Sequence, residues 1–376
     1  MFLALRELRF ARGRFALMGA VVALIAILVV LLSGLSVGLA NDGVSGLQRI
    51  NATSFAFQQG VSTDSAFSRS VVEEGAVEVW AGQPGVAAAT PFGNTLVNAR
   101  TDRGVEIDLA LFGVEGGSFL DPSVAFGSAE MEEGQVVISR TAAQEGVEIG
   151  DTIILQPSEA ELTVVDILED QHTFGHVDVG YVPLRSWQEA RTGVREGDVV
   201  PDRVYAEFTA VAVQLEDGAD IDVAAVDEVA GTSSLTREES FGASPGYTAE
   251  TATLQLIQGF LYAISALVVG AFFTVWTIQR RQEIAVLRAL GARTRYLLRD
   301  SLVQSIVLLV LSAGAGIAIG LALGAAVSAT SMPFALEAGP IVAATALLLV
   351  LGLVGAALAV LRITRVDPLA ALGGSR

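Results

Sequence analysis

The sequence predicts an α-helical membrane domain of four transmembrane helices, with an α+β extracytoplasmic domain inserted between the first and second helices. Three observations lead to this prediction. The chain is 52% apolar and only 17% charged, a balance typical of membrane proteins. The chain contains long runs without charged residues, and most of its carboxylates lie in a different segment from the clusters of arginines. Together these features place a water-soluble acidic domain between apolar helices.

Four runs are long enough to cross a bilayer, because about 20 apolar residues of helix span roughly 30 Å of hydrocarbon. The predicted transmembrane helices are residues 15–40, 251–279, 301–330 and 338–362. The first run could instead be a cleaved signal peptide, since arginines precede it and Gly38-Leu39-Ala40 resembles a cleavage site. Its apolar core is longer than the usual 7 to 15 residues of such a peptide, so we interpret it as an anchor.

The charge distribution predicts the orientation of these helices. Residues 1–14, 280–300 and 362–376 together carry 13 arginines against four acidic residues, whereas residues 41–250 carry 10 arginines and 36 acidic residues. Cytoplasmic flanks of transmembrane helices collect positive charge. We therefore expect both termini, including the tail 363–376, and the basic loop 280–300 to be cytoplasmic, and residues 41–250 to lie outside the membrane of a bacterial cell.

The outer region is predicted to be α+β, because short alternating or β-branched runs bounded by Gly, Pro and Asp are interspersed with helical patterns. It holds no cysteine, so no disulfide stabilises it. The predicted strands are 105–114, 135–139, 152–155, 162–168, 177–182 and 204–213, and the predicted helices are 66–80, 140–144 and 184–191.

The sequence argues against an enzyme. It contains no lysine, and a phosphate-binding Walker loop requires one. No HExxH helix is present either. Gly314, Gly316, Gly320 and Gly324 lie within the third apolar run, where small residues are expected to let helices approach closely. No resident cofactor and no catalytic residue is predicted.

His172 and His176 are weak candidates for a metal site. Their four-residue spacing would suit a metal only on a helix, and Gly175 with the following VDVGYV favours a loop that enters a strand. We therefore expect loop histidines that are solvated or hydrogen-bonded.

The basic loop has one apolar face and one arginine face, because its leucines recur at helical spacing while Arg281, Arg288 and Arg295 recur every seventh residue. Gly291 is placed as a helix C-cap would be. Two interpretations remain open from the residues alone: an interfacial helix on anionic headgroups, or a docking element for a cytoplasmic protein.

Several stretches resemble the MacB and FtsX type of ABC-transporter permease. The loop RRQEIAVLRALGARTRYLLRDSLVQS is similar to the coupling element of that family, and LALRELRFARGRFAL resembles its cytoplasmic amphipathic entry helix, here residues 1–14. VVISRTAAQEGVEIGDTIIL resembles its extracytoplasmic core and RVDPLAALGG its closing motif. Within the family, LSGLSVGLANDG and NATSFAFQQGVSTDSAFSRS look most like the haem-efflux (Hrt-type) permeases and the related Dev-type exporters.

The resemblance implies a homodimer that works with a separate ABC ATPase subunit, on which ATP is bound and hydrolysed. The residues expected to couple the permease to that ATPase are Arg281, Glu283, Leu287, Arg288, Leu290, Gly291 and Arg295.

The resemblance also implies a hydrophobic substrate, with haem the leading candidate, expelled from the outer leaflet of the membrane. Because the chain lacks cysteine, an iron ligand near the membrane would be a tyrosine, a methionine or a carboxylate. The tyrosines could equally form an aromatic belt at headgroup level. The candidate substrate-binding residues are Tyr247, Gln255, Gln258, Tyr262 and Tyr181.

Two other functions are compatible with the same chain. One is export of lipids, lipoproteins or peptides through the dimer interface. The other is mechanotransmission, in which the outer domain controls a cell-wall hydrolase or a sensor and nothing is transported. Neither function, nor haem export, involves nucleic acid.

Overall fold

The computed structural model describes residues 12–125, 131–195, 199–279, 294–330 and 332–364. The chain forms two compact units: residues 1–38 with 251–376, called the membrane unit below, and Leu39–Glu250, called the outer domain. The predicted fold class is confirmed, since within these described ranges four helices are long and apolar enough to cross a membrane and an α/β domain is inserted between the first two of them.

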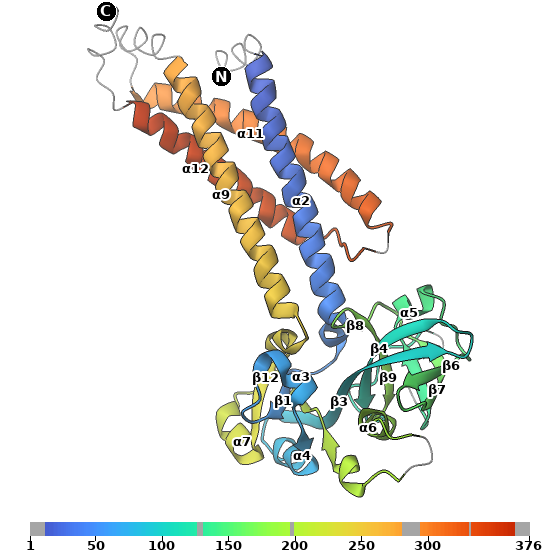
Figure 1. Cartoon of the computed structure of the whole chain (residues 1–376). Helices are drawn as coiled ribbons and strands as arrows, with labels where there is room; N and C mark the ends of the chain where they lie inside the picture. Colours follow the sequence, from blue (N-terminus) through green and yellow to red (C-terminus); the bar gives the residue numbers. More distant parts are fainter. Residues whose placement is uncertain (1–11, 126–130, 196–198, 280–293, 331, 365–376) are drawn as a thin grey trace, which may run out of the picture. The chain divides into compact units, whose positions relative to one another are not determined.

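The membrane unit consists of long apolar helices, of which the first continues past its predicted end. The candidate spans within the helices are Phe15–Arg49, Tyr247–Trp276, Leu302–Val327 and Ala338–Leu358. The last eleven residues of the first helix, 39–49, belong to the outer domain. The helices are α2 (Arg12–Arg49), α9 (Tyr247–Gln279), α11 (Thr294–Val327) and α12 (Ala338–Thr364) (Figure 1).

Helices α2 and α11 approach closely at a glycine, as the sequence predicts. A Cβ atom at Gly316 would lie 2.3 Å from the Ala23 carbonyl oxygen, whereas one at Gly314 would meet no atom within 4 Å. Hydrophobic association cannot drive helices together in lipid, so such close van der Waals contact is what holds them.

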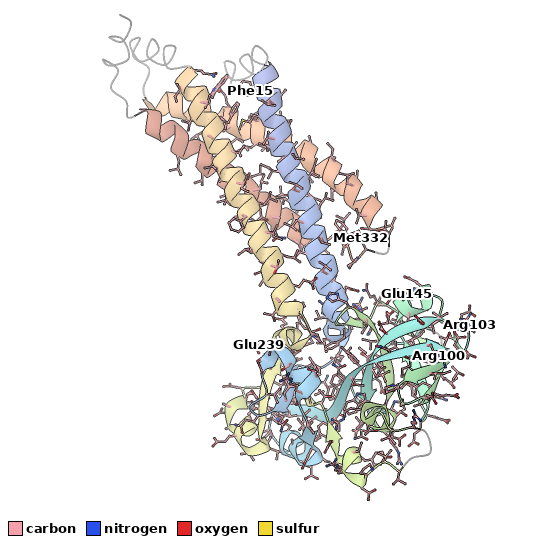
Figure 2. All side chains as sticks on the ribbon, viewed as in Figure 1. Phe15, Arg100, Arg103, Glu145, Glu239 and Met332 are labelled. Carbon is pink, nitrogen blue, oxygen red and sulfur yellow. The ribbon has the colours of Figure 1, made fainter. Side chains whose placement is uncertain are left out.

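The loop between α11 and α12 is seated on α2 through Phe334. The Ala335 N–H donates to the Gly34 carbonyl oxygen over 3.1 Å, and a Cβ at Gly34 would lie 2.3 Å from the Phe334 ring. Met332 of the same loop is exposed (Figure 2). The loop therefore ties the third and fourth spans to the first.

The outer domain is built on a ten-stranded sheet in the order β12-β1-β11-β3-β4-β9-β5-β7-β6, with β8 paired to β9. Strand β3 also pairs with β6, so the six strands from β3 to β6 in this order form a closed ring. The strands are β1 (Ser54–Gln58), β3 (Val86–Thr101), β4 (Glu106–Val114), β5 (Gln135–Ile138), β6 (Thr152–Gln156), β7 (Glu161–Ile167), β8 (Thr173–Phe174), β9 (Val177–Pro183), β11 (Ala210–Leu215) and β12 (Thr232–Thr236), and β2 (Val72–Glu73) pairs separately with β10 (Glu207–Phe208).

The sheet separates two apolar cores, because successive side chains of a strand point to opposite faces. Along β1, Ala56 belongs to one core with Trp80 and Trp187, and Phe55 belongs to the other. The second core is rich in phenylalanine rings packed edge to face and also holds Leu47 of α2. The outer end of the first span is thus a structural part of the outer domain.

Most predicted outer elements match the structure, with two corrections. The predicted helix 66–80 is interrupted by β2, so that only α3 (Ala66–Arg69) and α4 (Glu74–Ala81) are helical. The predicted strand 204–213 begins instead as the 3-10 helix η2 (Asp202–Ala206), because the short β10 must turn to pair with β2. The remaining described helices of this domain are α5 (Arg140–Gln144), α6 (Leu184–Thr192), α7 (Val223–Ala230) and α8 (Arg237–Ser240), with η1 (Thr63–Ser65) and η3 (Phe241–Ala243).

We expect Gly316→Ala to destabilise the membrane unit by about 1–3 kcal/mol, because the added methyl group overlaps the α2 backbone, which cannot rotate away. The measurement is the thermal unfolding midpoint of the full chain in detergent. Gly314→Ala is the matched control and should be neutral or slightly stabilising, since alanine favours helix and has space there. Equal effects of the two substitutions would show that α2 and α11 are not in close contact.

Candidate functional site at the β8–β9 turn

The β8–β9 turn carries His176 in a backbone conformation that the turn imposes. Strands β8 and β9 pair Phe174 with Val177, which leaves a two-residue connection. Both connecting residues have positive φ, 59° at Gly175 and 67° at His176, as a type I′ hairpin turn requires. Glycine accepts this conformation freely, and histidine is among the residues that tolerate it best. The turn therefore fixes where the imidazole projects.

The same turn is bound to the outer end of α2. The Gly175 N–H donates to the Gly43 carbonyl oxygen over 2.9 Å, and the Thr173 N–H donates to Ser45 Oγ over 2.9 Å. The Ser244 hydroxyl donates to that Gly43 carbonyl over 3.0 Å. These bonds hold the last turns of α2 against both the hairpin and the segment that leads into α9.

His176 joins two carboxylates that come from the two spanning helices. Its Nδ1 lies 2.8 Å from Asp42 Oδ2, on α2, and its Nε2 lies 3.1 Å from Glu250 Oε2, on α9. A neutral imidazole has one N–H, so only the doubly protonated ring can donate to both carboxylates at once. Such charge-assisted bonds are roughly twice as strong as neutral ones.

Tyr247 completes this arrangement at the first residue of α9. A Cβ atom at Gly43 would lie 3.4 Å from Tyr247 Cδ2 and 3.8 Å from His176 Cε1, so both rings border the same α2 residue. We call Asp42, Gly43, His176, Tyr247 and Glu250 the junction cluster. It brings a phenol, an imidazole and two carboxylates together at the ends of two spans.

Two of the predicted residues belong to the interior of the outer domain. Tyr181 is 1% exposed, its ring packs on Phe112 and His172 with centroids 5.5 and 6.0 Å apart, and burial raises the pKa of its phenol. His172 is 5% exposed. Among the described residues no group of three His, Cys, Asp or Glu side chains could hold a metal ion.

The remaining predicted substrate residues share one face of α9. Gln255, Gln258 and Tyr262 follow one another at spacings of three and four residues, which places them on the same side of a helix. Gln255 is exposed, while Gln258 and Tyr262 are half-buried. Polar side chains on a membrane-spanning helix are expensive and mark substrate or ion paths.

The predicted coupling residues lie almost entirely outside the described part of the chain. Arg295 is within α11, where the structure describes the backbone only. The others, which stay predictions, are Arg281, Glu283, Leu287, Arg288, Leu290 and Gly291.

Sequence reasoning missed Asp42 and Glu250. Both stand just outside a charge-free run, Asp42 two residues after the first and Glu250 immediately before the second. A carboxylate just outside an apolar run is a pattern that could have marked both residues as candidates. Their partner His176 could not have been predicted, because it lies 134 residues from Asp42 and 74 from Glu250.

Behind the junction cluster, Asp178 and His172 have pKa values shifted in opposite senses. Burial raises the pKa of the Asp178 carboxyl to about 6, against hydrogen bonds from Thr141 and Ser139. Burial also lowers the pKa of His172 to about 4, with a further contribution from the charge of Arg49. The backbone N–H of His172 donates to Ser139 Oγ, and Ser139 also hydrogen-bonds the Asp178 carboxylate. Both residues therefore contact the same serine.

Comparison with known proteins agrees with this architecture. Residues 256–368 match the family model "FtsX-like permease C-terminal". The chain is 24% identical over 377 residues, 100% of each chain, to the "Putative hemin transport system permease protein HrtB" of Staphylococcus epidermidis. It is 36% identical over 124 residues, 32% of this chain and 19% of the relative, to the "Pyoverdine export ATP-binding/permease protein PvdT" of Pseudomonas syringae pv. tomato.

Among solved structures, the periplasmic region of MacB from Actinobacillus actinomycetemcomitans aligns at a TM-score of 0.37 and 13% identity, over 51% of this chain and 92% of that one. Among the described residues, four helices are long and apolar enough for a multi-pass membrane protein. More particularly, the chain carries an FtsX-like permease C-terminal domain, which confirms the resemblance to the MacB and FtsX type of ABC-transporter permease.

The opposite pKa shifts of Asp178 and His172 make the stability of the outer domain depend on pH, and single substitutions should reveal this dependence. Between about pH 4 and 6, Asp178 binds a proton more readily in the folded than in the unfolded chain. This residue's contribution to stability therefore rises as the pH falls. Over the same range, His172 binds a proton in the unfolded chain but much less in the folded chain. Its contribution to stability therefore falls as the pH falls. Each slope approaches about 1.4 kcal/mol per pH unit, and the two oppose each other.

We therefore expect Asp178→Asn to make the outer domain lose stability on acidification relative to the parent, and His172→Gln to make it gain stability. The measurement is hydrogen exchange of the β9 amides in the full chain, corrected for intrinsic rates, from pH 4.5 to 7.5. Differences from the parent at each pH cancel the titration of other carboxylates. Parallel profiles for the two variants would contradict the assignment of either shift.

Proposed function

We propose that the chain is the permease subunit of an ATP-driven ABC exporter that works as a homodimer with a separate ATPase and expels a hydrophobic substrate, haem, from the outer leaflet. The observation that carries this proposal is the junction cluster. It places a phenol and two carboxylates at the outer ends of the first two spans, where α9 also begins its line of polar residues.

A separate ATPase is supported by two facts. The chain has no lysine and so lacks the Walker loop of a nucleotide site. Its relative PvdT, matched over 32% of this chain, is named as an ATP-binding/permease protein, which associates a permease segment of this kind with ATP binding. The arginine-rich loop 280–300 is the segment we assign to docking.

Haem as the substrate is supported by the chemistry of the junction cluster and by the name of the HrtB relative. Tyrosine is an established axial ligand of haem iron, and Tyr247 belongs to the cluster. Because His176 already uses both ring nitrogens on Asp42 and Glu250, we assign ligation to Tyr247 and a positioning role to His176.

Movement can reach this cluster through the helices themselves. Asp42 lies on α2 and Glu250 on α9, and both helices run without interruption from the membrane unit into the outer domain. A change in the separation of their ends would strain or break the His176 bridge. ATP-driven transport needs such a difference, since energy moves a substrate only through contacts that differ between two states.

We expect Tyr247→Phe to abolish the shift of the Soret band that haemin undergoes on binding to the reconstituted permease, because the phenyl ring cannot ligate iron. The measurement is an absorbance titration of the full chain in nanodiscs. Tyr205→Phe is the matched control, since Tyr205 donates to Glu189 on the outer domain and lies outside the cluster. Tyr262→Phe tests the second predicted tyrosine.

An unchanged Soret shift in Tyr247→Phe would remove this residue from the site. No spectral change with the parent chain at all would overturn the haem assignment. Cells lacking the protein, challenged separately with haemin and with membrane-active peptides, would then decide for or against the alternative of lipid or peptide export.

The docking assignment predicts that Arg288→Ala with Leu290→Ala abolishes co-purification of the ATPase, because the pair removes one residue from each face of the loop. The measurement is the amount of ATPase retained on the tagged permease in detergent. Arg376→Ala, in another arginine-containing segment that we expect to be cytoplasmic, should retain it. Full retention by the double variant would show that the ATPase binds elsewhere.

A further inference from the structure

A hollow of about 240 Å³ lies between the beginning of α2 and the end of α9. The junction cluster lies at the opposite end of each helix. Leu17 of α2 lines one side. Phe272, Val275, Trp276 and Gln279 of α9 line the other. All five residues belong to the membrane unit, and none is among the residues predicted from the sequence or used in the proposed function.

The back wall of this hollow is aromatic and held in place. Trp276 stacks on Phe272 with an interplanar angle of 10°, and Phe15 meets the Trp276 ring edge-on with centroids 4.5 Å apart. Phe15 is only 5% exposed and lies near the beginning of α2 (Figure 2). Such aromatic pairs contribute about 0.5–1.5 kcal/mol beyond area burial, so the wall is preformed.

The front of the hollow is open and apolar. Leu17 is 72% exposed and Val275 is 53% exposed. Both lie within apolar spanning segments, where the surroundings are hydrocarbon. The volume is below the roughly 300–1,000 Å³ of pockets that enclose a drug-sized molecule. The hollow is therefore large enough for part of a lipid acyl chain but too small for a porphyrin.

The end of the hollow is polar, and the sequence places an arginine one helical turn before Leu17. Gln279, the last residue of α9, supplies an amide. On α2, Arg14 precedes Leu17 by three residues, a spacing that places the two positions on one face of the helix. Arginine recognises phosphate through its planar fork of donors, and basic sites between transmembrane helices bind anionic headgroups.

We propose that this hollow is a binding site for an anionic phospholipid, with one acyl chain against the Phe272–Trp276 wall and the phosphate at the level of Arg14. The combination selects among lipids, because the apolar wall accepts any chain while the arginine position distinguishes the headgroup. The site is separate from the junction cluster and does not depend on haem being the substrate.

Trp276 reports on this site directly. It is one of three tryptophans in the chain, and the other two, Trp80 and Trp187, are buried in the core of the outer domain. The emission lost in Trp276→Phe defines its share of the signal. Bromine atoms on an acyl chain quench tryptophan on contact, so lipids brominated on the chain measure occupancy of the hollow.

The experiment reconstitutes the full chain in nanodiscs with increasing mole fractions of brominated phosphatidylglycerol or brominated phosphatidylcholine. Half-maximal quenching of Trp276 should occur at a several-fold lower fraction of phosphatidylglycerol. Val275→Phe fills the hollow and should remove this difference. Leu267→Phe, at another exposed α9 position (73%), is the matched control and should keep it.

Arg14→Gln separates the two parts of the site. It should lower the preference for phosphatidylglycerol while leaving quenching by either lipid at high mole fraction. Equal quenching by the two lipids in the parent chain would show ordinary contact with bulk lipid and would overturn the proposal. So would a Val275→Phe profile identical to that of Leu267→Phe.

Discussion

The outer domain depends on the contact between the β8–β9 turn and the outer ends of two spanning helices. The turn bonds to the backbone of α2 at Gly43, and its histidine lies between Asp42 of α2 and Glu250 of α9. Because Leu47 is fully buried in the aromatic core of the domain, the helix end is also part of that core. Helix α2 therefore contains both an apolar candidate span and an interior element of the outer domain.

Helix α2 makes specific contacts in each of the two units. Within the membrane unit, the helix packs on α11 at Gly316 and receives the α11–α12 loop through Phe334. Within the outer domain, the same helix carries one carboxylate of the junction cluster. A displacement of α2 or α9 would thus be felt at a bridge whose strength depends on geometry and on the charge of one imidazole. The acidic domain concentrates carboxylates around this single ring, and burial of Asp178 behind it raises the pKa of that carboxyl.

Much of the architecture could be predicted from the sequence because lipid imposes strict rules. The absence of charge from four runs predicts the spans, and alternation predicts β4, β5, β7 and β9. The sixteen-residue β3 was missed, since its flanking and internal Gly, Pro and Asn residues indicate turns, although the strand changes partners from β11 to β4 and β6 along its length. The continuation of α2 past Ala40 was missed because Asn41, Asp42 and Gly43 are poor helix formers, and tertiary bonds from the hairpin override that preference. No sequence pattern could bring His176 to carboxylates so distant along the chain.

The proposed function requires that substrate at the junction cluster and ATP hydrolysis on a partner subunit are coupled through this chain. It is tested most directly by the ATPase activity of the full complex in nanodiscs, measured with and without haemin for the parent chain and for His176→Asn. Asparagine keeps the left-handed turn but cannot bridge the two carboxylates. We expect haemin to stimulate hydrolysis by the parent complex, and we expect His176→Asn to lose the stimulation while keeping basal activity. Hydrolysis that is indifferent to haemin, or stimulation that survives in His176→Asn, would contradict the proposed function.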